Sequence, residues 1–199
     1  ITVAPEVEGV LDLIKAGVSK GIEFSIGHSG ASYEQVLVAV EHGLRQVTHI
    51  FNGMPGLHHR SPGVLGAALT DNRLWAQIIV DGIHVHPAIV KLLIAAKGIN
   101  RMILITDAIR ATGMQDGDYT LGDQFVHVHG GIARTDAGGL AGSTLTMDQA
   151  LRNVMQFADL SIQKALPMAT RVPADAMGMR GKKGVLAADA DADIVILDD

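Results

Sequence analysis

The stretch WAQIIVDGIHV, residues 75–85, joins an apolar run to a polar end. Its first part, residues 75–80, is nearly continuous in apolar side chains, a pattern that is typical of a strand covered on both faces. The same kind of run predicts further strands at residues 1–4, 22–28, 45–51 and 101–105. Because such strands are apolar on both sides, helices must cover both faces of the sheet that they form.

Helical patterns occupy the segments between these runs. Ser32, with Gln35 three residues later, predicts a helix that begins with a capping box. Pro87 suits the first turn of a helix, and Gly98 suits the position just after its end. Helices are accordingly predicted at residues 64–70 and 87–97 as well. Strands that alternate with helices in this way indicate an α/β fold with a parallel sheet.

The pattern changes after residue 106. Residues 117–139 alternate in polarity and are rich in glycine, which predicts a hairpin excursion rather than another strand–helix unit. Residues 144–158 return to a helical pattern, and residues 162–177 predict helical pieces interrupted by prolines. The closing segment, GVLAADADADIVILDD, predicts a turn followed by an edge strand.

Composition limits the classes of protein that need to be considered. The chain has 199 residues, 48% of them hydrophobic, which is enough for one sizeable core. A net charge of −5 argues against nucleic-acid binding, and the absence of cysteine excludes disulfides and thiolate metal sites. No run approaches the length of a membrane span, so we expect a cytoplasmic protein that does not bind membranes. The start, ITVAPE, lacks a methionine and opens within an apolar run, so we expect a truncated chain.

Polar residues recur at the end of each predicted strand. They are Glu6, His28, His49, His84 and Asp107. A single histidine in such a place is more often a hydrogen-bonded core residue, but a series of them favours a site. The carboxyl ends of parallel strands converge on one face, which holds the active site in a (β/α)8 barrel. Imidazoles that converge with a carboxylate suit zinc or another divalent metal.

At this point the sequence resembles a known family. The motifs that carry the resemblance are GHSGAS (27–32), THIFNGM (48–54), DGIHV (81–85), LITDA (104–108) and LAGSTLTM (140–147). In this order and spacing, they resemble the N-acetylglucosamine-6-phosphate deacetylases of the amidohydrolase superfamily. The resemblance implies metal-dependent hydrolysis of the acetamide of N-acetylglucosamine 6-phosphate to glucosamine 6-phosphate and acetate.

The resemblance also implies the architecture. The expected fold is a partial (β/α)8 TIM barrel that contains strands four to eight, followed by the start of a small β-sandwich. Residues 1–184 would form the barrel part, with the hairpin insertion near residues 117–139. Residues 185–199 would start the C-terminal sandwich segment. Strands one to three of the family barrel have no counterpart in this sequence.

The family's metal ligands carry over to His28 and His49. The third family ligand is a glutamate upstream of this chain, and we expect Glu6 to be structural rather than its equivalent. The metal is expected to be zinc, with iron, cobalt or manganese as alternatives. Asp107 resembles the catalytic aspartate, although an N-cap or turn residue after a strand would fit its position equally well.

Substrate contacts also follow from the resemblance. The residues that match them are Asn52, Gly53, Arg60, His84, Leu140, Ala141, Gly142 and Ser143. Arg60 matches a phosphate-binding arginine, and a guanidinium binds phosphate through two parallel hydrogen bonds. In the family this arginine reaches the substrate of the neighbouring subunit, so the resemblance implies a homodimer.

Two other interpretations remain open from the sequence. The first is an amidohydrolase that acts on a different N-acyl or cyclic amide and does not need Arg60. The second is an inactive, truncated protein that only binds a sugar phosphate. The remaining loop and hairpin histidines have no family role, and we expect most of them to be solvated: His58, His59, His127 and His129.

Overall fold

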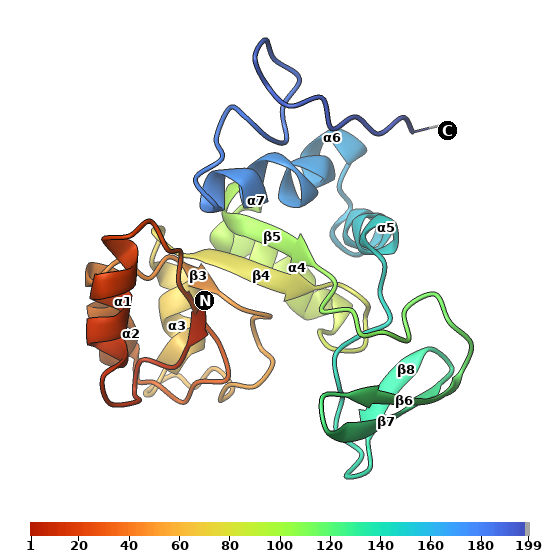
Figure 1. The fold of residues 1–199 in the computed structure, drawn as a ribbon, viewed down its shortest axis with the longest axis horizontal. Coiled ribbons are helices and arrows are strands. Elements are labelled where there is room, and N and C mark those ends of the chain that lie inside the picture. Colours follow the sequence, from red (N-terminus) through yellow and green to blue (C-terminus); the bar gives the residue numbers. More distant parts are fainter. Residues whose placement is uncertain (198–199) are drawn as a thin grey trace.

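Five parallel strands form the centre of the computed structural model, which describes residues 1–197 (Figure 1). The strands are β1 (Thr2–Val3), β2 (Ser25–Ile26), β3 (Gln46–Val47), β4 (Trp75–Ile79) and β5 (Met102–Ile105). Each one pairs in parallel with the next strand along the chain. The sheet is open, with β1 and β5 at its edges. The predicted α/β fold, a five-stranded part of a barrel, is therefore confirmed.

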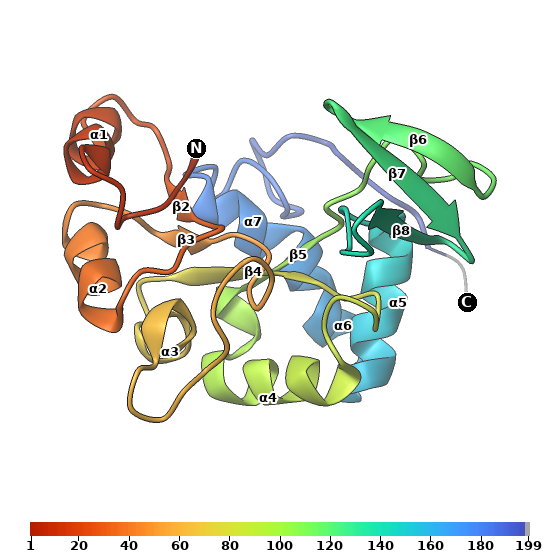
Figure 2. The same ribbon diagram turned by 90° about the horizontal axis from the view of Figure 1, so that it is seen from below.

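Helices connect and cover these strands. They are α1 (Val10–Val18), α2 (Tyr33–Glu41), α3 (Gly63–Thr70), α4 (Pro87–Lys97), α5 (Met147–Ala158), α6 (Ile162–Ala165) and α7 (Arg171–Ala176). Two short 3₁₀ segments, η1 (Ile99–Arg101) and η2 (Leu166–Ala169), precede β5 and α7. In Figure 2, α3 and α4 lie on one side of β4, and α7 lies on the other side of the sheet. Within the described residues, no helix is long and apolar enough to cross a membrane.

Local sequence signals explain two of the helix boundaries. The Ser32 side chain accepts a hydrogen bond from the Gln35 amide, and the Gln35 side chain accepts one from the Ser32 amide, which forms the predicted capping box. Pro87 lies in the first turn of α4, and Gly98 caps its end with a φ of 75°.

The main core lies between the sheet and its helices. Strand residues Ile26, Val47 and Leu104 belong to it, together with helix residues that include Ile14 and Val40. All five side chains are buried, and they come from segments far apart in the sequence. Burial of each side chain of this kind contributes about 1.5–3 kcal/mol of transfer free energy. This core fixes the relative positions of the strand ends, where the polar residues lie.

The predicted hairpin excursion is confirmed as a small antiparallel sheet. Its strands are β6 (Gly117–Leu121), β7 (Gln124–His129) and β8 (Ile132–Thr135). Val126 and Val128 are buried with Ile109 and Ala141 in a second core. Because Ile109 follows β5 and Ala141 belongs to the LAGS motif, this core ties the small sheet to the end of the parallel sheet. Figure 1 shows the chain running from the end of β5 to the small sheet.

The closing segment differs from the sequence expectation. No strand forms between residues 185 and 197, and Val195 and Ile196 are 81% and 92% exposed. A strand needs a neighbour to pair with its backbone groups, and this segment has none within residues 1–197. Residues 198–199 lie outside the described residues. The division into a barrel part up to residue 184 and the start of a sandwich stays a prediction.

Candidate active site

A cavity of about 500 Å³ opens at the carboxyl ends of the parallel strands. It is lined by most of the predicted site residues: His28, His49, Asn52, Gly53, His84, Asp107, Leu140, Ala141 and Gly142. Arg60 and Ser143 do not line it. The structure thus brings together side chains that are separated by more than a hundred residues in the sequence.

The two histidines predicted as metal ligands lie side by side. Nε2 of His28 and Nε2 of His49 are 3.0 Å apart. The rings are nearly perpendicular, at 82°, so both nitrogens point to one place from different directions. His49 is buried, while His28 is exposed to the cavity. This pair brings two imidazole nitrogens close together, as two ligands of one metal ion would be.

The backbone is unusual where these side chains leave the sheet. His28, His49 and Asp107 have φ values of 48°, 31° and 51°, in the left-handed region that residues other than glycine seldom adopt. Such conformations cost on the order of 1–3 kcal/mol each and occur most often at functional sites. They also explain why β2 and β3 are shorter than predicted, because the chain turns out of the sheet at or just before these residues.

Gly53 makes room for His28. A Cβ atom at this position would lie 2.8 Å from Nδ1 of His28, and φ is +61°. Both facts require glycine, because a side chain would push the ring away and strain the backbone. The family match at Gly53 therefore has a structural reason as well.

A divalent metal fits this pair of histidines. In a tetrahedral zinc site, with Zn–N distances of about 2.0–2.1 Å, two ligand nitrogens lie about 3.3 Å apart. The observed separation of 3.0 Å is close to this value. Nδ1 of His49 is buried without a hydrogen-bond partner within residues 1–197, so no hydrogen bond competes for this ring from its other side. The described residues supply no group of three or more possible ligands, so His28 and His49 alone would fill only part of a coordination shell.

Glu6 is engaged elsewhere. One carboxylate oxygen accepts a hydrogen bond of 2.7 Å from Ser29 Oγ, and the other accepts one of 2.7 Å from the Gly30 amide. Burial raises the pKa of Glu6, but these hydrogen bonds outweigh it, and the net pKa lies below the ordinary value. Both oxygens thus hold the loop after His28, which agrees with a structural role.

Asp107 presents its carboxylate to the cavity from a fixed backbone. Its carbonyl oxygen accepts a hydrogen bond of 2.8 Å from the Ser143 amide, and the Ser143 carbonyl accepts one of 2.9 Å from Ile109. The Ser143 hydroxyl donates to the Thr106 carbonyl. Ser143 is buried by these contacts, so it holds the strand end in place and does not face the cavity. The Asp107 side chain itself is exposed and forms no hydrogen bond with residues 1–197.

Asn52 and Arg60 lie in the loop after His49. The Asn52 side-chain amide donates to the carbonyls of His49 and Ile50, at 3.2 and 3.3 Å, which leaves its side-chain oxygen for a ligand. Arg60 lies farther along the loop, exposed, with its guanidinium 2.7 Å from Nε2 of His59. Arg60 therefore does not contribute to the cavity formed by its own chain.

One residue near the site, Asp81, was not among the site residues predicted from the sequence. Asp81 lies in the DGIHV motif, and its carboxylate is 2.6 Å from Nδ1 of His84. Burial raises the pKa of Asp81, but hydrogen bonds from the His84 side chain and from the amides of His84 and Ile83 lower it below the ordinary value. The signal in the sequence is an aspartate three residues before a histidine, directly after a buried strand.

The two histidines of the antiparallel sheet lie at the protein surface, outside the cavity. His127 lies on β7, with Nδ1 2.6 Å from Asp118 and Nε2 2.7 Å from Asp136. Both ring nitrogens are therefore satisfied at the protein surface. The side chain of His129 is fully exposed. Neither residue lines the cavity, and a metal site in this sheet has no support from their positions.

Comparison with known proteins shows the family of the chain. The chain matches the Amidohydrolase family over residues 3–199 and belongs to that family. It is 45% identical to an N-acetylglucosamine-6-phosphate deacetylase of Vibrio furnissii over 94% of the chain, or 46% of that protein. It is also 43% identical to an N-acetylgalactosamine-6-phosphate deacetylase of Escherichia coli O157:H7 over the whole chain, or 52% of that protein. The chain thus spans about half the length of these relatives.

Solved structures show the same relationship in three dimensions. The N-acetylglucosamine-6-phosphate deacetylase of Thermotoga maritima is 36% identical, with a TM-score of 0.92 over 96% of this chain and 52% of that one. A variant of the Mycobacterium smegmatis enzyme, in complex with N-acetyl-D-glucosamine-6-phosphate, is 39% identical with a TM-score of 0.90. The match covers 96% of this chain and 51% of the Mycobacterium smegmatis chain. The resemblance that the motifs indicated is confirmed by these matches.

Proposed function

We propose that this protein hydrolyses the acetamide of N-acetylglucosamine 6-phosphate, giving glucosamine 6-phosphate and acetate, with the help of a divalent metal. The convergence of His28, His49 and Asp107 in one cavity at the strand ends supports this function most directly. The deacetylase relatives support the same chemistry and the same class of substrate.

The roles of the residues follow from their positions. His28 and His49 would hold the metal, which supplies an activated water and polarises the amide carbonyl when bound. The Asp107 carboxylate accepts a proton from the water as its oxygen attacks the acetyl carbon. Asp107 then delivers this proton to the sugar nitrogen as the carbon–nitrogen bond breaks. The second proton of the water stays on the acetic acid until it passes to the amine or to solvent, so acetate and the amino sugar leave. An exposed carboxylate without an internal partner suits both steps.

The remaining contacts would hold the sugar phosphate. Asn52, Gly53, Leu140, Ala141 and Gly142 line the same cavity, so the side-chain oxygen of Asn52 and the backbone of Gly53 would be within reach of a bound sugar. Arg60 would bind the phosphate of a substrate in the neighbouring subunit of a homodimer. Its exposed position outside its own cavity supports this arrangement, and guanidinium is well suited to phosphate.

The identity of the metal and the location of the protein are also proposals. Imidazole nitrogens suit zinc best, with iron, cobalt or manganese as alternatives. A cytoplasmic location fits a phosphorylated substrate.

A second substrate has a specific observation in its favour. The 43% identity to an N-acetylgalactosamine-6-phosphate deacetylase extends over the whole chain. The two substrates share the acetamide and the 6-phosphate and differ only in the orientation of the C4 hydroxyl. The proposed roles of His28, His49, Asp107 and Arg60 are the same for both sugars, so the choice depends on contacts to that hydroxyl.

Turnover of matched sugars tests the proposal. The purified protein, supplied with zinc, is assayed for acetate release from N-acetylglucosamine 6-phosphate, its C4 epimer and unphosphorylated N-acetylglucosamine. We expect the highest kcat/KM with the first sugar and the lowest with the third. If the C4 epimer is preferred, N-acetylgalactosamine 6-phosphate becomes the proposed substrate and the proposed mechanism is unchanged. Equal activity with and without phosphate would favour an amidohydrolase of different specificity.

A further inference from the structure

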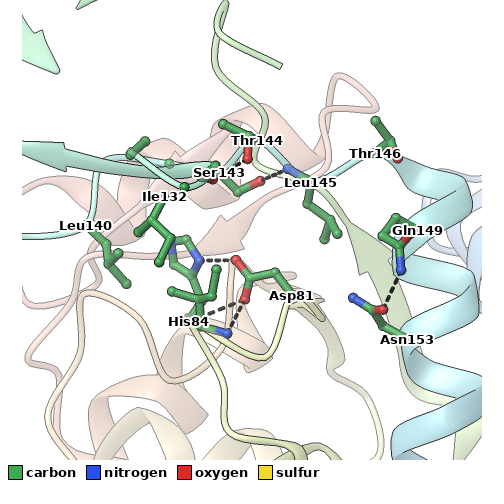
Figure 3. Close-up of a pocket in the computed structure, with 15 residues that line it drawn as sticks. Asp81, His84, Ile132, Leu140, Ser143, Thr144, Leu145, Thr146, Gln149 and Asn153 are labelled. Atoms are coloured by element: carbon green, nitrogen blue, oxygen red, sulfur yellow. Dashed lines mark hydrogen bonds and ion pairs between the residues drawn. The ribbon is translucent and has the colours of Figure 1, made fainter. Parts of the chain in front are cut away.

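Asp81 is enclosed beside His84 just after β4. Oδ1 of Asp81 accepts hydrogen bonds of 2.8 Å from the amides of both Ile83 and His84, and Oδ2 lies 2.6 Å from Nδ1 of His84 (Figure 3). The side chains of His84 and Asp81 are only 7% and 10% exposed. The two carboxylate oxygens therefore act separately, since Oδ1 holds the turn and Oδ2 holds the imidazole.

The other ring nitrogen of His84 is free. Nε2 has no hydrogen-bond partner within residues 1–197, and it is not among the buried unsatisfied atoms. His84 lines the cavity that contains His28, His49 and Asp107, and it also lines a neighbouring cavity of about 460 Å³. Nε2 is thus the atom of His84 that is left to meet a ligand.

A hydrogen bond from helix α5 holds the chain just after β4 in place. The Asn153 amide on α5 donates a hydrogen bond of 2.7 Å to the carbonyl of Val80, the residue before Asp81. The Asn153 side-chain oxygen accepts one of 2.7 Å from Gln149 (Figure 3). This chain of contacts anchors the backbone that carries Asp81, so the carboxylate has little freedom to leave the ring.

An ionised carboxylate only accepts hydrogen bonds, so the short contact at Oδ2 requires a proton on Nδ1 of His84. In a neutral ring, Nε2 then carries the lone pair. From this geometry we infer that Asp81 is a positioning residue, which holds His84 in the Nδ1–H form so that Nε2 accepts a hydrogen bond from a hydroxyl group of the bound amino sugar. This role rests on the proposed function for the identity of the ligand, but not for the state of the ring.

Replacing Asp81 by asparagine should move the proton of the His84 ring from Nδ1 to Nε2. Only the side-chain oxygen of asparagine can accept from the amides of Ile83 and His84, so it must take the place of Oδ1. The side-chain NH₂ group then faces Nδ1, which has to become the acceptor. The proton moves to Nε2, and a hydroxyl donor from the sugar no longer finds a lone pair there.

The experiment measures this proton directly. Nitrogen-15 NMR of histidine-labelled protein, in alkaline buffer, distinguishes the two neutral forms of the ring, and the spectrum of His84→Ala identifies the signal. We expect Nδ1–H in the wild type and Nε2–H in Asp81→Asn. With N-acetylglucosamine 6-phosphate, Asp81→Asn should lose roughly ten- to a hundredfold in kcat/KM, the loss expected for a hydrogen bond in a buried polar site. Its metal content should not change.

Asp118→Asn is a matched control, because it makes the same change beside His127 on the surface. It should leave kcat/KM as it is. A wild-type ring in the Nε2–H form overturns the inference, even if Asp81→Asn does not fold. Loss of activity without a change of the ring also overturns it, because that result indicates only a structural role. If the ring changes as expected but no sugar phosphate is hydrolysed by the wild type, the proposed function fails, and only the control of the ring's proton by Asp81 stands.

Discussion

The histidines at the strand ends and those on the antiparallel sheet are bonded in opposite ways. His28 and His49 point their Nε2 atoms at each other, and Nδ1 of His49 is buried without a partner within residues 1–197. His127, by contrast, is exposed and has an aspartate on each ring nitrogen. A buried polar atom without a partner costs about 1–3 kcal/mol, so a fold built for stability alone would avoid it.

The backbone shows the same contrast. His28, His49 and Asp107 have left-handed conformations at the strand ends, whereas none of the residues of β7 has a positive φ. Two costs, in backbone conformation and in hydrogen bonding, therefore coincide at one cavity. Backbone strain of this kind is concentrated at functional sites, so it supports a ligand site at these strand ends.

The largest effect in this comparison is expected at Asp107. Asp107→Asn keeps the shape of the side chain but removes the proton acceptor, so turnover should fall by about 10²- to 10⁴-fold. Bound metal should stay at the wild-type level, since Asp107 is not among the expected ligands. Acetate release and elemental analysis of the same samples check this. Near-normal turnover in Asp107→Asn would remove Asp107 from the mechanism.

Arg60 should give a smaller and more selective loss. Arg60→Ala removes a charge-assisted hydrogen bond to phosphate, worth roughly 1.5–3 kcal/mol, or about ten- to a hundredfold in kcat/KM. The loss should appear with N-acetylglucosamine 6-phosphate and be nearly absent with N-acetylglucosamine. Kinetics on both sugars measure it. An equal loss on the two sugars contradicts phosphate recognition by Arg60.

Lys97 provides a measure of what burial costs outside the site. Burial lowers its pKa to about 8, although the nearby Asp71 charge opposes this shift, and Nζ donates a hydrogen bond of 2.5 Å to the Asp71 carbonyl. Between this pKa and the ordinary value of 10.5, the unfolded chain binds more protons, so stability rises with pH. The free energy of unfolding should increase by at most about 2 kcal/mol from about pH 8 to about pH 10.

Urea denaturation at both pH values measures the increase, and Lys97→Met is the control. The variant lacks the titrating group, so its stability should not show this rise. A rise of the same size in Lys97→Met would assign it to other groups.

The smallest effect is expected at His127. Hydrogen bonds to Asp118, which has the larger effect, and to Asp136 raise the pKa of His127. Its contribution to stability is therefore present at low pH and is lost as pH rises through the folded-state pKa. Because the group is exposed, solvent screens these pairs, and His127→Ala should leave the melting temperature almost unchanged at about pH 5 and about pH 8. A large drop at the lower pH would show that the surface pairs stabilise more than the comparison implies.

Much of the fold could be predicted from the sequence because the signals are local. Apolar runs marked each parallel strand, and the Ser32–Gln35 pair and Pro87 marked helix starts that the structure confirms. The clustering of His28, His49 and Asp107 followed from one topological rule, that parallel strands end on the same face.

Other features depend on contacts that the sequence does not reveal. Helix α1 was not predicted, because Gly9 precedes it in a left-handed turn and no side chain caps it. The turns out of the sheet at His28 and His49 depend on left-handed backbone conformations, which no motif encodes. The spacing of Asp81 and His84 is visible in the sequence, but the contact between carboxylate and ring is seen only in the folded turn after β4.

Metal content tests the central claim, that the strand-end histidines form a metal site, most directly. Elemental analysis would compare the wild type, His28→Ala, His49→Ala and His127→Ala, with turnover measured on the same samples. We predict that the wild type and His127→Ala hold the same amount of metal and have the same activity, while His28→Ala and His49→Ala lose both together. Wild-type metal content in His28→Ala and His49→Ala would contradict the claim.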